Sequence, residues 1–579
     1  MINFRKYNNA TRIVIPNSIT LSNGDFSNAF NGMTNLVTCE FNHPSVVNMS
    51  NIFNCCQKLT GSPVCGDNVV SMSYAYNGCV NITGSPVCGP NVTTMTNAYM
   101  LCRNLTGEPV CGDKVKSMVW TYNGCRNLTG SPVCGPNVSN MQGTYTYCTN
   151  LTGSPACSDS VKDMFNTYAE CINLTGSPVC SNQAGNMTWT YHNCHNLTGA
   201  PVCGPQVNSM WMTYANCYNL SGPPVCGEYV TIMTATYANC YKLTGSPVCG
   251  EYVKSMTNAY RSCVSLTGSP VCGDLVTNMA DAYHNSGVSG SPVCGPNVTD
   301  MTRAYKYCRS SLNGSPVCGE NVIYMGEAYN DCRWLTGSPV CGNNVAYFTA
   351  TYANCSSLTG SPVCGPNVLY MEGAYTRCYK LTGSPACGDR VYSMWLAYSE
   401  CDNLTGTPAC GNNVVNMGSA YEYCSNLNGA PMCGPKVNDM SRAYLSCSNL
   451  TGNPVCGDNV TNMSSAYAYC YKLTGPAVCG NKVTNMATAY EGCSGLARNA
   501  YLYSKYVRNI SNCFSGVYNL NKRYNIYVPA NSTTLDTLLG TSGWMTNDMA
   551  TNNYYYNSYL NVYIYPVANV AAARAANGD

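Results

Sequence analysis

The chain has 579 residues, of which only 10% are charged, and its formal net charge at pH 7 is +2. So small and balanced a charge excludes the basic field with which proteins attract nucleic acid or an anionic membrane. The four histidines leave little material for acid–base catalysis near neutral pH. No Ser-His-Asp arrangement, paired-carboxylate motif or glycine-rich phosphate loop occurs, so we expect neither an enzyme nor a bound cofactor.

Residues 1–45 precede the regular part of the chain and are expected to form an N-terminal cap with a weak first coil. They include the strand-like stretch Ile-Val-Ile-Pro at 13–16. The opening residues, MINFRKYNNATRIVIPNSIT, contain no apolar run of signal-peptide length and no small-residue cleavage pattern, so no signal peptide is visible in this chain. No run of about 20 apolar residues occurs anywhere, so we expect no membrane insertion.

Residues 46–514 repeat one phrase about every 23 residues, as in CRNLTGSPVCGPNVSNMQGTY at 125–145. The clearest marker is an aromatic residue, phenylalanine at the ends and tyrosine elsewhere, that recurs from Phe30 to Phe514 and counts 22 coils. A fixed period of this length is typical of solenoids, in which each unit is stabilised by packing on its neighbours.

Within one coil, Met72, Ala75, Tyr76 and Cys79 follow the i, i+3, i+4, i+7 spacing of an apolar helix face. The other half, Leu-Thr-Gly-Ser-Pro-Val-Cys-Gly at 59–66, is β-leaning and bounded by glycine, which predicts a short strand. In that strand we expect the cysteine to face inward and the valine outward. One short strand and one short helix per coil predict an α/β repeat solenoid, a leucine-rich-repeat-like array of about 22 coils of 23 residues with terminal caps.

The 41 cysteines fall mainly into two columns of 19 residues, one following Pro-Val (as Cys65) and one three residues after the tyrosine (as Cys79). Because a free cysteine packs as a small hydrophobic residue, we interpret both columns as reduced structural thiols, with oxidation between neighbouring coils as the alternative. The short CxxC spacing of zinc sites is missing, so no metal site is expected. His192 and His195 flank Cys194, but they occupy outward positions that do not converge on one ion.

The composition changes after residue 515, where NIYVPANSTTLDTLL, GWMT and NNYYYNSYLNVYIYPV predict a few strands with turns. Residues 515–579 are therefore expected to form a β-rich segment. It is either a cap over the open end of the solenoid or a docking or oligomerisation segment, since it has more tyrosines than a cap needs. The final residues, AAARAANGD at 571–579, predict a mobile tail.

The positions that vary from coil to coil lie next to the methionine, tyrosine and cysteine columns, and several carry aromatic residues. Exposed aromatics on a polar solenoid can stack on sugars or anchor a protein partner. The alternative is that they pack between neighbouring coils. The candidate binding residues are Trp120, Trp189, Trp211, Trp334, Trp395, Tyr241 and Tyr379.

The phrases A-Y-x-x-C-x-x-L-T and N-V-T-N-M resemble two related bacterial repeats, the BspA-like leucine-rich repeat and the bacterial surface-protein repeat. Tyr467, Cys470 and Leu473 match the first, residues 459–463 match the second, and the resemblance covers roughly residues 10–530. The Gly-Ser-Pro-Val-Cys stretch departs from the leucine or isoleucine usual in those families. The families include surface adhesins, lipoproteins and proteins encoded by gut phages.

The repeat and this resemblance together predict a non-enzymatic attachment protein, located in a virion, outside the cell or on the cell surface. Its elongated repeat surface is expected to bind a host surface glycan or protein, or other virion proteins, and homo-oligomers are possible. A bacterial cell-surface adhesin is one alternative, and a structural or filament-forming repeat protein is another.

Overall fold

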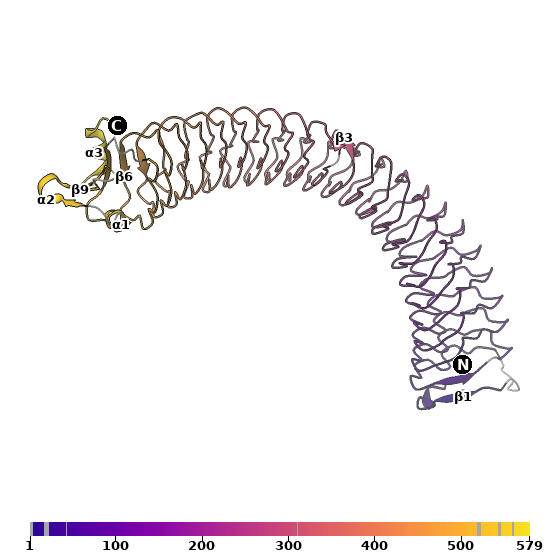
Figure 1. The fold of residues 1–579 in the computed structure, drawn as a ribbon. Helices are drawn as coiled ribbons and strands as arrows, with labels where there is room; N and C mark the ends of the chain where they lie inside the picture. The colour runs from indigo at the N-terminus through magenta and orange to yellow at the C-terminus, as the bar shows by residue number, and fades with distance from the viewer. Residues whose placement is uncertain are drawn as a thin grey trace. The chain divides into compact units, whose positions relative to one another are not determined.

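The computed structural model describes residues 4–16, 23–41, 43–309, 311–517, 523–541, 546–557 and 561–579. The chain is a repeat solenoid that divides into two compact units, Met1–Ser289 and Gly290–Asp579. Each unit is a stack of similar coils (Figure 1). The division falls where the spacing between successive core tyrosines drops to 22 residues, after Tyr283, before it rises to 24 after Tyr305.

Among the described residues, helices and strands occur at the two ends of the chain and around the boundary between the units. The first unit begins with η1 (Arg5–Tyr7) and the parallel strands β1 (Arg12–Val14) and β2 (Thr38–Glu40). Two-residue strands β3 (Ser289–Gly290) and β4 (Ser311–Leu312) follow. The second unit ends with β5 (Ala477–Cys479), β6 (Asn499–Leu502), β7 (Tyr524–Pro529), α1 (Thr533–Thr541), β8 (Thr546–Asp548), α2 (Met549–Asn552), β9 (Tyr554–Asn557), β10 (Val562–Val567) and α3 (Val570–Ala576).

The prediction of one helix per coil is wrong, because residues 43–309 and 311–514 contain no α-helix and the helix-like stretch is a ribbon of successive turns. Ala75 N–H donates to the Met72 carbonyl three residues back (3.0 Å), whereas Tyr74 N–H donates to Thr96 in the next coil (2.8 Å). The φ angle at Tyr74 is +58°, which a continuous α-helix does not allow. Alternate amides therefore bond along the stack, and the turns reproduce the apolar spacing of a helix.

The predicted strand is also different, since the Pro-Val-Cys stretch is extended but forms no ladder with its neighbours in the described coils that precede β5. The hydroxyl of Tyr99 accepts the N–H of Val87 (3.1 Å) and donates to the Val87 carbonyl (2.7 Å) of its own coil. Proline supplies no N–H for a ladder. Parallel pairing instead occurs at single residues just before the methionine, as at Ser71 and Thr94.

The interior consists of the repeated leucine, valine, methionine, tyrosine and cysteine columns. Successive tyrosine rings stack, as Tyr76 and Tyr99 do with centroids 5.5 Å apart and an interplanar angle of 3°. The thiol of the fully buried Cys102 donates to the Tyr76 carbonyl of the preceding coil (3.0 Å). Neighbouring coils such as these thus bond through backbone, ring and thiol, as nearest-neighbour stabilisation of a solenoid requires.

The Pro-Val-Cys column is oriented differently from the prediction, because the proline is buried while Val64 and Cys65 are both half-buried. A Cβ added at Gly89 would come within 3.1 Å of Cys65 Sγ, so the thiol lies over the glycine of the next coil. In the second unit the Cys364 sulfur accepts the Gly388 N–H (3.2 Å). All 41 cysteines lie among the described residues and are free thiols. Burial raises the pKa of Cys65 to about 11.

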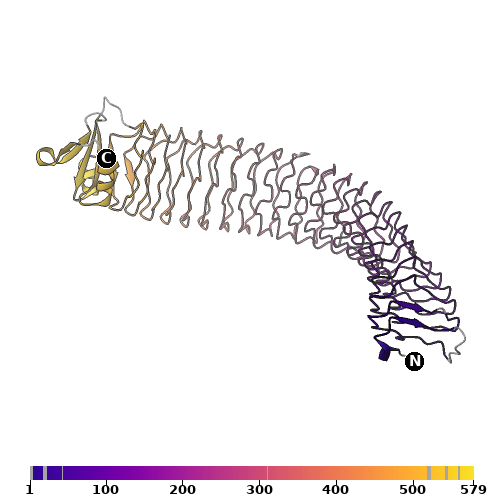
Figure 2. The same cartoon turned by 60° about the horizontal axis from the view of Figure 1, so that its bottom comes forward.

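The C-terminal sheet has the strand order β5-β6-β7-β10-β9-β8, parallel through the first four strands and antiparallel beyond β10. Figure 2 shows the sheet, in yellow, at the C-terminal end of the second unit. Its first strand begins where Ala477 occupies the place that Pro454 holds one coil earlier. Alanine has the backbone N–H that proline lacks, which is the local reason why a ladder starts at this coil.

Three helices accompany the sheet. Helix α1 packs against β7, and α3 packs against β6 and β7. Residues 571–579 differ from the expected tail, since α3 is capped by Asn569 and the Asp579 carboxylate accepts hydrogen bonds from Asn499 (2.5 Å) and Tyr501 (2.6 Å). Among the described residues, no helix has both the length and the apolar character needed to cross a membrane.

Candidate functional site

The turn ribbon creates two left-handed positions in every coil from Tyr76 to Tyr490, two residues before and two residues after the core tyrosine. A left-handed backbone costs roughly 1–2 kcal/mol for an L-residue with a bulky side chain, and glycine or asparagine is favoured there. Nevertheless, large aromatic residues occupy several of these positions. They are Tyr74, Trp120, Tyr147, Trp189, Tyr307, Tyr423 and Tyr469, with φ between +53° and +64°.

Trp189 is the centre of a cluster in the first unit. Its ring lies 5.9 Å from the ring of Trp211 in an edge-to-face arrangement and stacks on His192 at 5.5 Å. Trp211 is 43% exposed, and Trp189 is half-buried. The Trp189 Nε1 hydrogen has no acceptor in the described structure although the atom is buried. We call Trp189, His192 and Trp211 the Trp189 cluster.

A second aromatic stack follows the cysteine column of the same coils. His195 stacks on Tyr218 at 4.5 Å, and Tyr218 stacks on Tyr241 at 5.3 Å. Tyr241 is 43% exposed, so the stack ends in an accessible ring. Burial lowers the pKa of His192, although the Glu170 carboxylate 3.7 Å away opposes that shift, and His195 lowers it further. His195 of this stack is therefore close to His192 of the Trp189 cluster.

Trp120 lies three coils away from this cluster and is half-buried. A Cβ added at Gly143 would come within 2.0 Å of the Trp120 ring, so the indole packs over the glycine of the next coil. At this position the packing alternative describes the structure better than an open binding residue.

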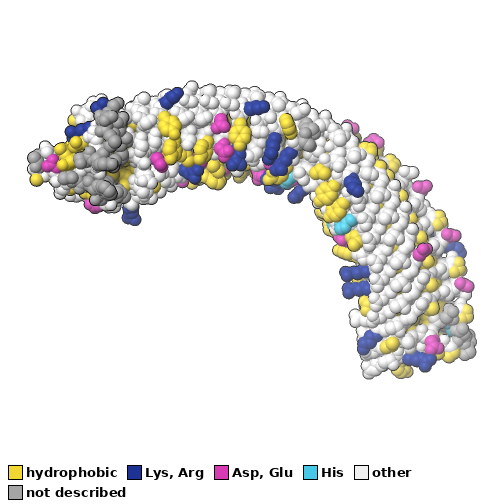
Figure 3. Space-filling model, in the orientation of Figure 1, with side chains coloured by type: hydrophobic (Ala, Val, Ile, Leu, Met, Phe, Trp, Pro, Cys, Tyr) yellow, Lys and Arg dark blue, Asp and Glu magenta, His cyan; other side chains and the backbone are white. Residues whose placement is uncertain are grey.

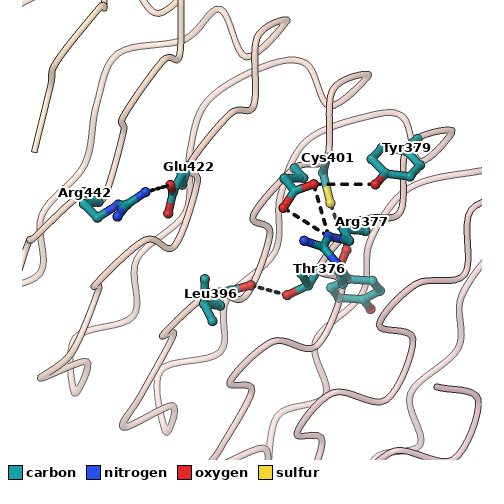
Figure 4. A network of polar contacts seen from close by, with 9 residues as sticks. Thr376, Arg377, Tyr379, Leu396, Cys401, Glu422 and Arg442 are labelled. Atoms are coloured by element: carbon teal, nitrogen blue, oxygen red, sulfur yellow. Dashed lines mark hydrogen bonds and ion pairs between the residues drawn. The ribbon is translucent and has the colours of Figure 1, made fainter. Parts of the chain in front are cut away.

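The remaining predicted residues belong to the second unit and are exposed at separate points. Trp334 is 58% exposed and Trp395 is 50% exposed. Tyr379 is 39% exposed, and its hydroxyl donates to the Glu400 carboxylate (3.5 Å). Arg377 binds the same carboxylate at 3.0 Å, so this tyrosine is part of a polar network (Figure 4).

Sequence reasoning missed two groups of surface residues in the second unit. Tyr324, Tyr347 and Tyr370 stack in successive coils, with centroids 5.0 and 5.9 Å apart, and each is 38–44% exposed. The other group consists of ion pairs between coils, such as Arg442 with the buried Glu422 (Figure 4). Aligning the coils and comparing each column over neighbouring coils would have revealed both groups.

Figure 3 shows that charged and hydrophobic side chains of the second unit gather in a band on the visible face, whereas much of the remaining face is uncharged and polar. Ion pairs in this unit join Lys306 with Glu327, and Asp331 with both Arg309 and Arg333. The variable positions therefore supply charge and aromatic rings to a surface that is otherwise repetitive.

Reactive chemistry is not supported by the thiols. Burial raises the pKa of Cys88 and of Cys102, the latter well above its ordinary value, so the nucleophilic thiolate is disfavoured. In the part of the chain that the structure describes, no group of three or more histidine, cysteine, aspartate or glutamate side chains could hold a metal ion.

No protein-family model matches the chain, and no curated protein matches it in sequence. Among solved structures it is similar to YopM from Yersinia enterocolitica WA-314, with 12% identity and a TM-score of 0.32 over 70% of this chain and 79% of that chain. It is similar to a leucine-rich repeat protein from Bacteroides ovatus ATCC 8483, with 11% identity and a TM-score of 0.21 over 91% and 89%. A leucine rich cell surface protein from Faecalibacterium prausnitzii A2-165 matches with 13% identity and a TM-score of 0.15 over 88% and 87%. Because these TM-scores are below 0.5, we base no function on the matches.

Proposed function

We propose that this protein is a non-enzymatic attachment protein that binds a host surface glycan or protein through the variable positions of its coils. It acts in a virion or on a cell surface. The observation that carries the proposal is the presence of bulky aromatic side chains at left-handed backbone positions, above all at Trp189.

Two features of Trp189 destabilise its own coil. Trp189 has a φ of +59° and a buried indole N–H without an acceptor, and each feature costs about 1–3 kcal/mol. The equivalent position is Gly143 or Asn166 in the two preceding coils, residues that suit this backbone. A residue that destabilises its own coil supports a role outside folding.

The chemistry of the Trp189 cluster fits recognition rather than catalysis. Aromatic rings contribute large contact area with little conformational entropy, and they stack on the apolar faces of sugars as readily as on protein side chains. Trp211 and Tyr241 present accessible rings in neighbouring coils, which suits a ligand that spans two coils.

The test is attachment of the full-length chain, fluorescently labelled, to a glycan microarray and to intact bacterial and epithelial cells. Replacing Trp189 and Trp211 together with alanine should lower binding at least about tenfold while the folded coils remain. The matched control replaces Tyr229 and Tyr252, a stacked and exposed tyrosine pair in the next two coils (6.3 Å), and should leave binding unchanged. Equal binding by the tryptophan variant and the native chain would refute the proposal.

A further inference from the structure

The strongest unexplained feature of the second unit is a buried carboxylate that holds two exposed guanidinium groups. Asp331 binds Arg309 through Oδ2 and Arg333 through Oδ1, the latter at 2.7 Å from Nε. Its side chain is only 7% exposed, whereas those of Arg309 and Arg333 are 53% and 57% exposed. Because the carboxylate is buried and shared, it fixes the position of both arginines.

Each arginine keeps donors that the protein does not use. A guanidinium has five N–H groups, and in the described structure Asp331 engages one nitrogen of each arginine. Arg309 also lies over the ring of Tyr307 at 4.7 Å, which holds its guanidinium plane. The two arginines therefore present oriented donors without the entropy cost of ordering free side chains.

The local charge favours an anion. We call Asp331, Arg309 and Arg333 the Asp331 cluster. It contains two cations and one anion, and the adjacent Lys306 is neutralised by Glu327. The net charge of the Asp331 cluster is +1. Its positive groups are exposed, whereas its negative group is buried. Planar guanidinium groups match the two oxygens of a carboxylate or sulfate.

Trp334, which follows Arg333 in the sequence, adds a second kind of contact. At 58% it is the most exposed tryptophan among the described residues, and no other described ring packs against it. Ser356 and Ser357, in the same columns of the next coil, are half-exposed, and Ser356 donates to the Arg333 carbonyl (3.4 Å). An anchor for a protein partner usually lies within a wider apolar patch, whereas Trp334 follows an arginine in the chain and serines occupy these two columns in the next coil.

We infer that Arg309, Arg333 and Trp334 form a subsite for an acidic saccharide, whose carboxylate or sulfate binds the arginines and whose ring stacks on the indole. This inference rests on the proposed attachment function and names a ligand class for the second unit. The acidic sugar can come from an animal glycan ending in sialic acid or from a bacterial polysaccharide of hexuronates.

The experiment measures binding of the full-length chain to 3′-sialyllactose, to a hexuronate oligosaccharide and to neutral lactose by titration calorimetry. We expect binding of at least one acidic probe and none of lactose, with affinity falling as salt is raised. Trp334→Ala should weaken the acidic probe about tenfold, and Trp334→Phe should recover part of the loss. The relative affinities of the two acidic probes identify the source.

The arginines are tested with the triple variant Arg309→Gln, Asp331→Asn, Arg333→Gln, which removes the charges without leaving a buried carboxylate unpaired. It should lose the preference for acidic probes over lactose. The matched control is Glu422→Gln with Arg442→Gln, an equivalent pair with a carboxylate 7% exposed and an arginine 53% exposed. The control should bind acidic probes as the native chain does.

Three outcomes overturn the inference. They are no binding of either acidic probe, equal binding of lactose, and binding that poly-glutamate reproduces regardless of Trp334, which would indicate charge attraction alone or an acidic protein partner. Failure of the proposed function can be distinguished from failure of this inference. If cells bind the chain through Trp189 and Trp211 while no acidic saccharide binds, only the inference is wrong, and if neither occurs, both are wrong.

Discussion

The coils before β5 and the C-terminal sheet both stack aromatic rings at nearly the same spacing, but they satisfy their backbones differently. In the coils, rings such as Tyr421 and Tyr444 are buried with centroids 5.4 Å apart, and each hydroxyl bonds to the extended segment of its own coil. In the sheet, Tyr527 and Tyr565 stack at 5.1 Å but are half-buried on strands that pair directly.

The difference lies in the backbone N–H of the residue before the one that the hydroxyl contacts, because the coil of β5 keeps the tyrosine contact. The Tyr490 hydroxyl accepts the Val478 N–H (3.1 Å) and donates to the Val478 carbonyl (2.6 Å). Where proline removes the backbone donor, the hydroxyl bonds to both the N–H and the carbonyl of the next residue. Where Ala477 restores the donor, β5 also pairs with β6, so the ladder is added to the hydroxyl contact. Similar rings are therefore buried and bonded to the backbone of their own coil in the coils, whereas they are half-buried on paired strands in the sheet.

The largest effect should come from converting the sheet back to the coil pattern. Ala477→Pro removes a backbone donor from β5 and should destabilise the sheet by about 3 kcal/mol, because a ladder bond is lost and a partner group is left buried. In hydrogen exchange, the amides of β6 and β7 should exchange faster in this variant than in the native chain, and those of coils further from the sheet should change less. Ala477→Ser, which keeps the N–H, should exchange as the native chain does, and if both variants behave alike, the role assigned to proline is wrong.

A smaller effect is expected when the hydroxyl contact is removed from a coil. Tyr444→Phe deletes the hydroxyl that accepts the Met432 N–H (3.0 Å) and donates to its carbonyl (2.6 Å). The cost should be about 2 kcal/mol, seen as faster amide exchange in that coil and its neighbours. Tyr527→Phe in the sheet is the control and should cost less than about 0.5 kcal/mol. Equal losses would contradict the comparison.

The smallest effect concerns the sulfur contact that coils use between neighbours. The Cys410 sulfur accepts the Gly434 N–H (3.2 Å), so Cys410→Ala should cost about 1 kcal/mol through the unpaired amide and the lost packing. Cys410→Ser supplies an oxygen acceptor and should recover part of the protection of Gly434 against hydrogen exchange. Unchanged protection in the alanine variant would show that the thiol only fills space.

The interior of the coil could be predicted from the sequence, whereas its secondary structure could not. Leu59, Val69, Met72, Ala75 and Tyr76 are all buried as their recurrence indicates. The prediction of a helix was wrong because two consecutive reverse turns place apolar residues at the same spacing as two helical turns. Only the backbone conformation distinguishes the reverse turns from a helix, and the residues at the left-handed positions vary too much to indicate this conformation in the sequence.

The surface was predictable by type but not by arrangement. Trp211, Trp334, Trp395, Tyr241 and Tyr379 are exposed, while Trp120 packs on a neighbouring coil. The pairing of Asp331 with Arg309 joins residues 22 positions apart and follows only from the stacking of coils. Contacts along the stack axis are therefore the part that a single coil cannot reveal.

The hydrogen bonds between coils also bear on how such a gene can change. In the turn ribbon the N–H of one residue binds the carbonyl 22 positions later, as Tyr76 binds Ala98 (2.8 Å), and the same offset recurs at Tyr99 and Thr121 (2.9 Å). Loss or duplication of one whole repeat by recombination leaves every such donor facing an equivalent acceptor. The molecule can therefore be lengthened or shortened in increments of one coil, and any ligand-contacting side chains it carries can be redistributed, without a new fold having to evolve.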